Sequence, residues 1–586
     1  MFKLFKNFGK KQIIMLLVCI AFIILQVWLD LKIPDYMSEI TKLVQTPGSE
    51  MGQILIPGAY MVICALGSLI SSIAVGYFAA NIAGAFSMKI REKIFKKVEN
   101  LGVHEIKKFS TSSLITRTTN DITQIQMLIS MGMQVAVKAP ITAVWAITKI
   151  LGKSLEWTAV IASGVIILVI TIAIIMKVVM PRFGRVQNLL DKINGLTREN
   201  LIGIRVVRAF NAERYQEEKF EITNDELTNT QIFNQRTFGI MNPMMYLVMN
   251  ISTLAIYLIG TLLIKEAALV DRIDIFSDMV VFSSYGMQVI MSFLMLAMIL
   301  IMYPRAAVSA KRINEVLDEE ISIKEGNLKN APEVESGTVE FRNVSFKYPD
   351  GDDYVIKNIS FKAEKGETIA FIGATGCGKS TLINLIPRFY DATEGEVLVD
   401  GINVKDYKES VLNNKLGYVS QKAILFAGTI FENVAYGESN VEIDEEKVKK
   451  AIEIAQAKEF VEALDDNYYS HVAQGGTNLS GGQKQRISIA RAIARNPEIY
   501  IFDDSFSALD YKTDAKLRKE LKKYTENATT LIVAQRIGTI INADKIVVID
   551  EGKCVGMGSH KELLQNCEVY KEIALSQLSK EELENG

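Results

Sequence analysis

The stretch ETIAFIGATGCGKSTLINLI, residues 367–386, places an apolar run, a glycine-rich loop and a second apolar run in direct succession. Ile369–Ile372 is predicted to form a buried strand, and the segment after the loop is predicted to open a helix. The loop Gly373–Thr381 fits the pattern G-x-x-x-x-G-K-[ST]. A strand, this loop and a helix in that order predict a phosphate-binding loop in an α/β domain.

The residue types in this loop suit a nucleotide triphosphate with its metal ion. Glycines let the backbone approach phosphate closely, and the amides at the amino end of the helix point inward. Lys379 is predicted to reach the β- and γ-phosphates and Ser380 to ligate Mg²⁺, so the predicted cofactors are ATP and Mg²⁺. The residues predicted to line the loop are Gly373, Thr375, Gly376, Cys377, Gly378, Lys379, Ser380 and Thr381.

The amino-terminal half is far more apolar than the rest of the 586-residue chain, which is 49% hydrophobic overall. A bilayer core needs about 20 apolar residues per helix, so six membrane spans are predicted. Five runs carry no charge and the sixth is interrupted only by Lys138; in chain order the six are Gln12–Leu29, Met51–Met88, Ile122–Thr148, Trp157–Met176, Thr237–Ile264 and Met279–Pro304.

Positive charge predicts the orientation of these spans. Four lysines lie in the first eleven residues, eight Lys or Arg in Lys89–Asp121 and ten in Lys177–Arg236, whereas each alternate loop carries two. The positive-inside rule therefore predicts cytoplasmic termini and a multi-pass protein of the plasma membrane. The two long cytoplasmic connections have helical periodicity, which predicts levers that reach a cytoplasmic domain.

Composition excludes some classes of function. The formal net charge of −2 implies no bulk attraction to nucleic acid. The five cysteines are scattered, without the spacing of a disulfide framework or a zinc site. Lys138 is open to two interpretations: an intramembrane cation that acts on substrate or gating, or one that snorkels or faces an aqueous cavity without a specific role.

Two further motifs occur in the carboxyl-terminal half. IYIFDDSFSALD, residues 499–510, is a predicted buried strand that ends in Asp503 and Asp504, and acids at the end of a parallel strand suit a metal or nucleotide site. NLSGGQKQR, residues 478–486, opens a helix whose glycines and serine offer another phosphate-facing amino end.

The phosphate loop together with NLSGGQKQR resembles the ATP-binding cassette, and with six preceding spans the whole chain resembles one half of an ABC exporter. The resemblance implies an α-helical six-span membrane domain fused to an α/β P-loop cassette. The implied boundaries are residues 1–320 for the membrane domain, 321–337 for a linker and 338–586 for the nucleotide-binding domain.

Family roles follow by position. Tyr348 resembles the aromatic residue that stacks on adenine, and Asp503 the Walker B aspartate. Gln421 resembles the Q-loop glutamine near Mg²⁺, so the implied metal ligands are Ser380, Gln421 and Asp503. The signature residues that would bind nucleotide are Ser480, Gly481, Gly482 and Gln483.

Three segments have implied mechanical or structural roles. Ser507–Asp510 matches the D-loop. Ser112–Thr118 and Arg205–Ala212 are placed like the coupling helices that dock on the cassettes.

Three positions depart from the family pattern. Asp504 stands where the family usually has the glutamate that acts as general base, which pulls the carboxylate back by about 1.5 Å. Gln535 replaces the switch histidine, and glutamine carries no positive charge near neutral pH. Gln474 replaces a glutamate that many exporters have in the X-loop, a milder change.

Two degenerate residues at one γ-phosphate position predict a site that binds ATP but hydrolyses it poorly. Family cassettes pair head to tail, so the intact signature would serve the site of a second half-transporter subunit, in a bacterial heterodimeric exporter of the multidrug type. The predicted substrate is an amphipathic drug or lipid. The alternatives are an ATP-gated regulatory subunit, a slow homodimeric exporter and, less favoured, an importer.

Overall fold

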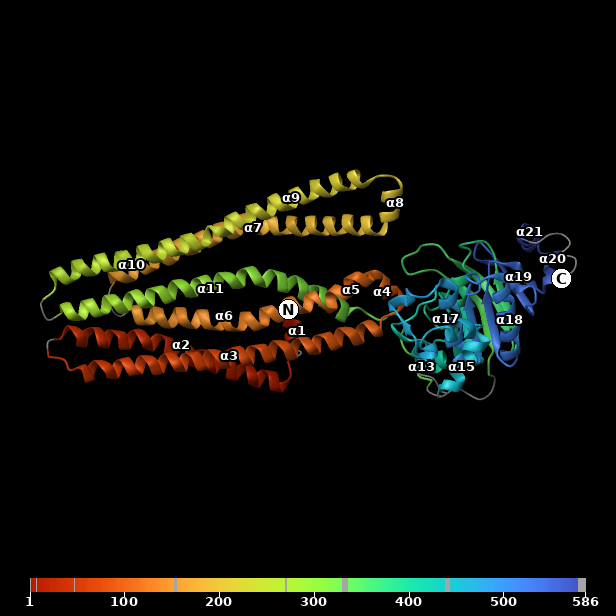
Figure 1. The fold of residues 1–586 in the computed structure, drawn as a ribbon, viewed down its shortest axis with the longest axis horizontal. Coiled ribbons are helices and arrows are strands. Elements are labelled where there is room, and N and C mark those ends of the chain that lie inside the picture. The colour runs from red at the N-terminus through yellow and green to blue at the C-terminus, as the bar shows by residue number, and fades with distance from the viewer. Residues whose placement is uncertain are drawn as a thin grey trace. The chain divides into compact units, whose positions relative to one another are not determined.

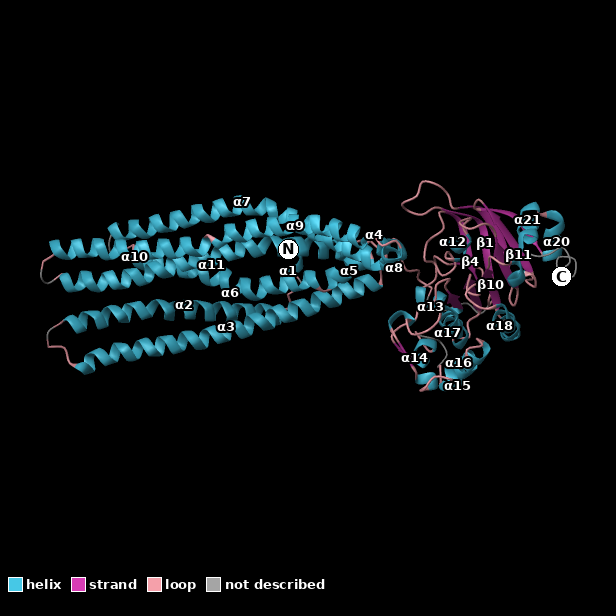
Figure 2. Cartoon of the chain, turned by 45° about the horizontal axis from the view of Figure 1, so that its top comes forward, coloured by secondary structure: helices cyan, strands magenta, loops and turns pink. Residues whose placement is uncertain are grey.

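The computed structural model describes residues 2–6, 8–46, 48–151, 155–268, 271–328, 336–437 and 443–577. The chain divides into two compact units. The membrane unit comprises Met1–Glu99 and Thr111–Glu319, and the cassette unit comprises Asn100–Ser110 and Glu320–Gly586. In the described residues, the membrane unit is helical and the strands lie in the cassette unit (Figure 2).

The prediction of six spans is confirmed, because six stretches are long and apolar enough to cross a membrane. The long helices α2 and α3 pack together, as do α7 and α9 (Figure 1). The helices of this unit are α1 (Phe2–Phe5), α2 (Lys10–Gln45), α3 (Met51–Glu99), α5 (Thr111–Thr118), α6 (Asn120–Ile150), α7 (Leu155–Ile202), α8 (Ile204–Ala209), α9 (Glu213–Gly239), α10 (Met241–Glu266) and α11 (Arg272–Asp318).

Aromatic and aliphatic side chains hold the membrane unit together. Trp157 of α7 and Phe282 of α11 have ring centroids 5.3 Å apart, in a cluster that also buries Ile23 of α2. Many other apolar residues are exposed on the helices, such as Ile70 at 65%. Apolar side chains exposed on this scale would be unfavourable in water, so these helix surfaces are suited to contact with lipid.

Lys138, the one charge within a predicted span, has a partner. Its Nζ lies 3.1 Å from Oδ2 of Asp30, on α2, and the hydroxyl of Ser68, on α3, donates to the other oxygen of the same carboxylate. The pair therefore links three helices, and neutralisation lowers the cost of placing the lysine there. Sequence periodicity missed this arrangement because Asp30 lies just outside the first charge-free run.

The cassette unit contains the helix α4 (Val103–Phe109) and all described strands. Its strands are β1 (Val339–Phe346), β2 (Ile356–Ala363), β3 (Thr368–Ile372), β4 (Glu394–Val399), β5 (Ile402–Asn403), β6 (Leu416–Val419), β7 (Gly428–Thr429), β8 (His471–Val472), β9 (Ile499–Asp503), β10 (Thr529–Val533), β11 (Lys545–Asp550) and β12 (Lys553–Gly558). Its other helices are α12 (Lys379–Ile383), α13 (Glu409–Lys415), α14 (Ile430–Val434), α15 (Glu445–Ile454), α16 (Lys458–Glu462), α17 (Gly481–Ala494), α18 (Tyr511–Tyr524), α19 (Ile537–Ile540), α20 (His560–Asn566) and α21 (Glu568–Gln577).

The strand order of the main sheet brings the candidate residues to one edge. The order is β12-β11-β3-β10-β9-β6, and β3 pairs in parallel with both β10 and β11. In parallel strands all carboxyl ends lie on the same side. The segments that follow β3, β6, β9 and β10 therefore converge, and these segments carry the phosphate loop, Gln421, Asp504 and Gln535.

Alternation along the strands builds two cores, one on each face of this sheet. On β9, Ile499 and Ile501 face one buried cluster, while Tyr500 and Phe502 face the other. Successive side chains of a strand point to opposite faces, so a continuous apolar run is the pattern of a strand covered on both sides. The sheet edge that carries the loops is thereby fixed rigidly.

Part of the predicted linker pairs with the cassette. Gly326 N donates to the carbonyl of Tyr407, and Leu328 N donates to the carbonyl of Asp406. The predicted coupling segment Ser112–Thr118 falls in α5, in the membrane unit, and the short helix α4 that precedes it belongs to the cassette unit. The role of Ser112–Thr118 as a coupling helix stays a prediction.

Candidate ATP-binding site

The phosphate loop has the geometry that its glycines predict. A Cβ on Gly373 would overlap the carbonyl oxygen of Ile549. Gly378 has φ = 105°, a left-handed conformation, and it caps α12, which begins at Lys379. Larger side chains at these positions would displace the loop. Because both residues are glycine, the backbone amides and the start of the helix remain accessible to a phosphate.

Lys379 occupies the centre of the loop. Its Nζ donates to the carbonyls of Gly373 and Ala374, at 2.8 Å each, and lies 3.6 Å from Sγ of Cys377. The side chain is almost wholly buried at 7% exposure. A buried ammonium whose two short hydrogen bonds go to neutral carbonyls favours an anion beside it, which suits the β- and γ-phosphates.

The donor set beside the loop fits Mg²⁺. Ser380 Oγ donates to Oδ1 of Asp503 at 2.7 Å. Burial raises the pKa of Asp503, against the hydrogen bond from Ser380, and the nearby carboxylate of Asp504 adds to the rise. A hydroxyl and a carboxylate are the hard oxygen ligands that Mg²⁺ prefers, and a cation here would offset the cost of the buried carboxylates.

The side chains of two residues from separate loops, Gln421 and Gln535, meet at the carboxylate of Asp504. Its Oδ2 accepts from Nε2 of Gln535 at 2.7 Å and from Nε2 of Gln421 at 3.2 Å. The Asp504 backbone is left-handed, with φ = 47°, and its N–H donates to the carbonyl of Val533 at 3.0 Å. Burial raises the pKa of Asp504 in spite of the hydrogen bond from Gln421. Two side-chain amides therefore donate to one oxygen of the Asp504 carboxylate.

Tyr348, the predicted adenine platform, lies next to the phosphate loop. Its hydroxyl is 2.9 Å from Oγ1 of Thr381. Its ring meets those of Phe346 and Tyr390 edge-on, with centroids 5.0 Å and 5.3 Å apart. This packing fixes an aromatic face close to the nucleotide loop, which is what stacking on a base requires.

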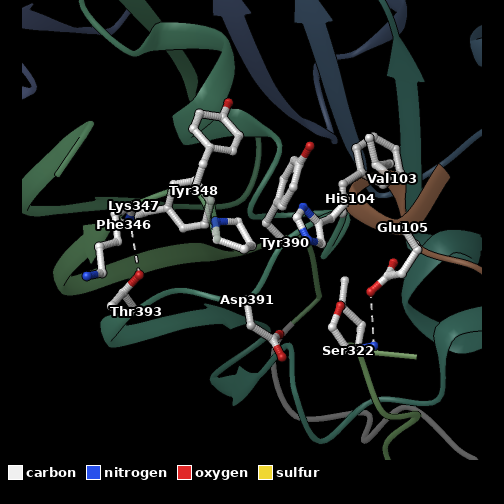
Figure 3. A pocket seen from close by; sticks show the side chains of 14 residues that line it. Val103, His104, Glu105, Ser322, Phe346, Lys347, Tyr348, Tyr390, Asp391 and Thr393 are labelled. Atoms are coloured by element: carbon white, nitrogen blue, oxygen red, sulfur yellow. Dashed lines mark hydrogen bonds between the residues drawn. The ribbon is translucent and has the colours of Figure 1, made fainter. Parts of the chain in front are cut away.

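A cavity of about 290 Å³ adjoins Tyr348 within the cassette unit (Figure 3). Val103, His104 and Glu105 of α4 lie on one side of this cavity and Tyr348 on the other. Glu105 is buried, and its Oε1 accepts from the backbone N–H of Ser322 at 3.1 Å. The short helix is thus anchored next to the predicted base-binding residue.

The signature lies at the start of α17, apart from the phosphate loop. Ser480 accepts from Gln483 N at 3.3 Å, and Gln483 Oε1 accepts from Ser480 N at 2.8 Å, which forms a capping box. Gly481 follows the cap, and Gly482 lies against the D-loop carbonyl of Ala508. Across the described ranges no hydrogen bond joins this motif to the phosphate loop.

Sequence reasoning missed one contact at this site. Gln577, the last residue of α21, donates through Nε2 to the carbonyl of Gln535 at 2.8 Å. Its Oε1 accepts from Ile537 N, also at 2.8 Å. No local pattern signals this contact, because the partners lie about 40 residues apart in the chain.

The fold and the site together define an ATP-binding membrane protein, and comparison with known proteins supports this class. The family profile described as the ABC transporter transmembrane region matches residues 16–293, and the profile described as ABC transporter matches residues 356–507. The chain belongs to the ABC transporter family.

The curated relatives extend over most of the chain. An uncharacterised ABC transporter ATP-binding protein of Mycobacterium tuberculosis is 38% identical over 518 residues, which cover 88% of this chain and 87% of the relative. The ATP-dependent lipid A-core flippase of Haemophilus influenzae is 31% identical over 504 residues, which cover 86% and 84% of the two chains.

A solved structure has the same fold. The chain superposes on a bacterial Atm1-family ABC exporter with ATP bound at a TM-score of 0.80, with 97% of this chain and 100% of the other covered. Sequence identity between the two is 22%. The likeness establishes an ABC exporter fold, with a six-helix membrane region and an ATP-binding domain in one chain.

Proposed function

We propose that the chain is one subunit of a heterodimeric, ATP-driven exporter whose own ATP site hydrolyses poorly. The observation that carries the proposal is the meeting of Asp504 and Gln535, whose side chains are hydrogen-bonded at 2.7 Å. The two departures from the family pattern therefore act on one γ-phosphate position. Misplacement of a catalytic group by about 1 Å can lower a rate on the order of 100-fold.

Residues of this chain would bind and orient nucleotide at the weak site. Tyr348 would stack on the base, Lys379 would contact the β- and γ-phosphates, and Ser380 with Asp503 would hold the metal ion. Bound Mg²⁺ supplies positive charge that offsets the charge of the phosphate oxygens. Gln421 is the third proposed metal ligand, and its amide donates to Oδ2 of Asp504 at 3.2 Å.

Hydrolysis would depend on the other site of the dimer. ABC exporters work as dimers, and head-to-tail pairing would set the signature of this chain against the phosphate loop of the partner. The capped start of α17 supports this role, because the amino end of a helix binds phosphate well. The partner would supply the glutamate and histidine that this chain lacks.

The proposed substrate is an amphipathic drug or lipid that moves outward from the cytoplasm or the inner leaflet. The six apolar membrane helices support a transport path that is accessible from the lipid. The relatives named lipid A-core flippases support a lipid-like substrate. We place the protein in the plasma membrane with both termini in the cytoplasm, because the positive-inside rule favours that orientation. Nucleic acid is not a proposed partner.

An ATP-gated regulatory subunit is the second candidate function. A chain that binds ATP without turnover would gate a partner equally well, and the double hold on Asp504 suits a static site. Transport into vesicles that depends on hydrolysis separates the candidates, since a regulatory subunit would move no cargo. A slow homodimeric exporter is the third candidate.

Asp504→Asn is expected to lower the ATPase activity of the co-purified pair by less than about threefold. The matching glutamate-to-glutamine change in the partner should lower it at least 100-fold, because a general base contributes on the order of 100-fold or more. Steady-state phosphate release, one substitution at a time, measures both effects. Equal loss from the two substitutions would show that both sites are catalytic and would overturn the asymmetric proposal.

The chain purified alone is expected to show little ATPase activity, and drug or lipid should not stimulate it. A homodimer would contain only sites built with Asp504 and Gln535, which are both degenerate. Phosphate release and drug uptake by the reconstituted chain provide the measurement. Robust transport by the homodimer would contradict the requirement for a partner.

A further inference from the structure

The last residue of the described carboxyl-terminal helix contacts the segment that carries the switch glutamine. Gln577 uses both atoms of its amide, donating to the carbonyl of Gln535 and accepting from the N–H of Ile537, each at 2.8 Å. The side chain thus bridges the residues on both sides of Arg536. A two-point contact of this kind fixes the backbone direction of the segment as well as its position.

This contact is not needed to dock α21 itself. The helix is anchored through Tyr570 and Ala574, both fully buried, and the hydroxyl of Tyr570 lies 2.6 Å from Nδ1 of His560. Gln577 is exposed and lies beyond this anchor. The helix is already held by its apolar face. The two hydrogen bonds of Gln577 therefore serve to position the backbone of Gln535–Ile537.

The contact continues into the site through the side chain of Gln535. That side chain donates to Oδ2 of Asp504 at 2.7 Å, and Asp504 also receives the amide of Gln421. Gln577 therefore holds the backbone of the residue whose side-chain amide donates to the Asp504 carboxylate. Connected polar groups restrict one another, so loss of the first member loosens the second.

We propose that Gln577 is a positioning residue that holds Gln535 where it meets the γ-phosphate of bound ATP. The inference rests on the proposed function, in which Gln535 occupies the position of the family's switch residue. It assigns to the carboxyl-terminal helix a part in distinguishing ATP from ADP. ADP has no γ-phosphate, so its affinity should not depend on Gln577.

The test is binding of two nucleotides to the full-length chain in lipid nanodiscs. Mg²⁺ with the non-hydrolysable ATP analogue AMP-PNP, and Mg²⁺ with ADP, each displace a fluorescent nucleotide. Gln577→Ala should weaken AMP-PNP by about three- to tenfold, the range expected for one or two hydrogen bonds, and should leave ADP unchanged. Gln565→Ala, at an exposed glutamine of α20, is the matched control and should change neither.

Two further variants identify the route. Gln577→Glu keeps an oxygen for Ile537 N but loses the donor to Gln535, so it should match Gln577→Ala if the bond to Gln535 is the one that matters. Gln535→Ala should weaken AMP-PNP selectively, and adding Gln577→Ala to it should have no further effect, because the two residues act in series.

Two outcomes would overturn the inference. One is an unchanged ratio of AMP-PNP to ADP affinity in Gln577→Ala, whether both affinities stay the same or both fall equally; the other is additive effects in the double variant. Failure of the proposed function appears elsewhere, as full loss of activity of the pair on Asp504→Asn. The binding ratio is measured on this chain alone and the activity on the co-purified pair, so the two failures are distinguishable.

Discussion

Gly482→Asp is expected to lower the ATPase activity of the co-purified pair at least 100-fold, the scale of losing a phosphate-facing donor at a reacting centre. Gly482 is the second residue of α17, where free amides and the helix dipole favour an anion. A carboxylate there would repel the γ-phosphate of the partner's nucleotide. A Cβ at this position would also lie 3.3 Å from the carbonyl of Ala508 in the D-loop.

Two measurements accompany this prediction. ATP affinity at this chain's own phosphate loop should stay unchanged, because the signature serves the other site, and co-elution of the two subunits should show that assembly is intact. Gly482→Asp and Asp504→Asn are then two substitutions in one chain with contrasting effects. The first should nearly abolish the ATPase activity of the pair, and the second should leave it nearly normal. Activity above half of the unmodified level in Gly482→Asp would contradict the assignment of the signature.

Lys379→Ala is expected to weaken ATP binding to this chain by about 10- to 100-fold. The ammonium is buried within the loop and would exchange its contacts with the carbonyls of Gly373 and Ala374 for charge-assisted bonds to phosphate. Each hydrogen bond that involves a charged group contributes about 1.5–3 kcal/mol. Displacement of a fluorescent nucleotide by ATP, with the full-length chain in nanodiscs, measures the loss.

The matched control for this prediction is Lys365→Ala. Lys365 is an exposed lysine of the same unit, and its Nζ lies 3.2 Å from Oγ of Ser336. Removal of a surface charge away from the loop should leave the affinity within about twofold, since exposed charges contribute little. Equal affinities of the Lys379→Ala and unmodified chains would refute the nucleotide site at this loop.

Local pattern alone predicted the membrane spans and the phosphate loop. The spans are recognisable because the bilayer demands about 20 apolar residues in succession, whatever the helices pack against. The loop is recognisable because close approach to phosphate demands glycine, lysine and a hydroxyl residue at fixed spacing within a few residues. Both constraints act along a short stretch of chain, so neither depends on the rest of the fold.

Pairing across the chain could not be predicted in this way. The sequence placed Lys138 inside a span but did not indicate Asp30 as its partner, 108 residues away. An ion pair between residues far apart in the chain cannot be recognised from local composition.

The sequence by itself determined which chemical groups this protein carries: a phosphate loop, an intact signature, and an aspartate and a glutamine where the family has glutamate and histidine. Folding in three dimensions brings Asp504 and Gln535 into contact, sets Gln421 on the same carboxylate oxygen, and places Gln577 of the last described helix against the backbone of Gln535. The physical reason is the parallel sheet, which brings the carboxyl ends of β6, β9 and β10 together from distant parts of the chain. Hydrogen bonds depend on that convergence in space, and spacing along the chain does not encode it.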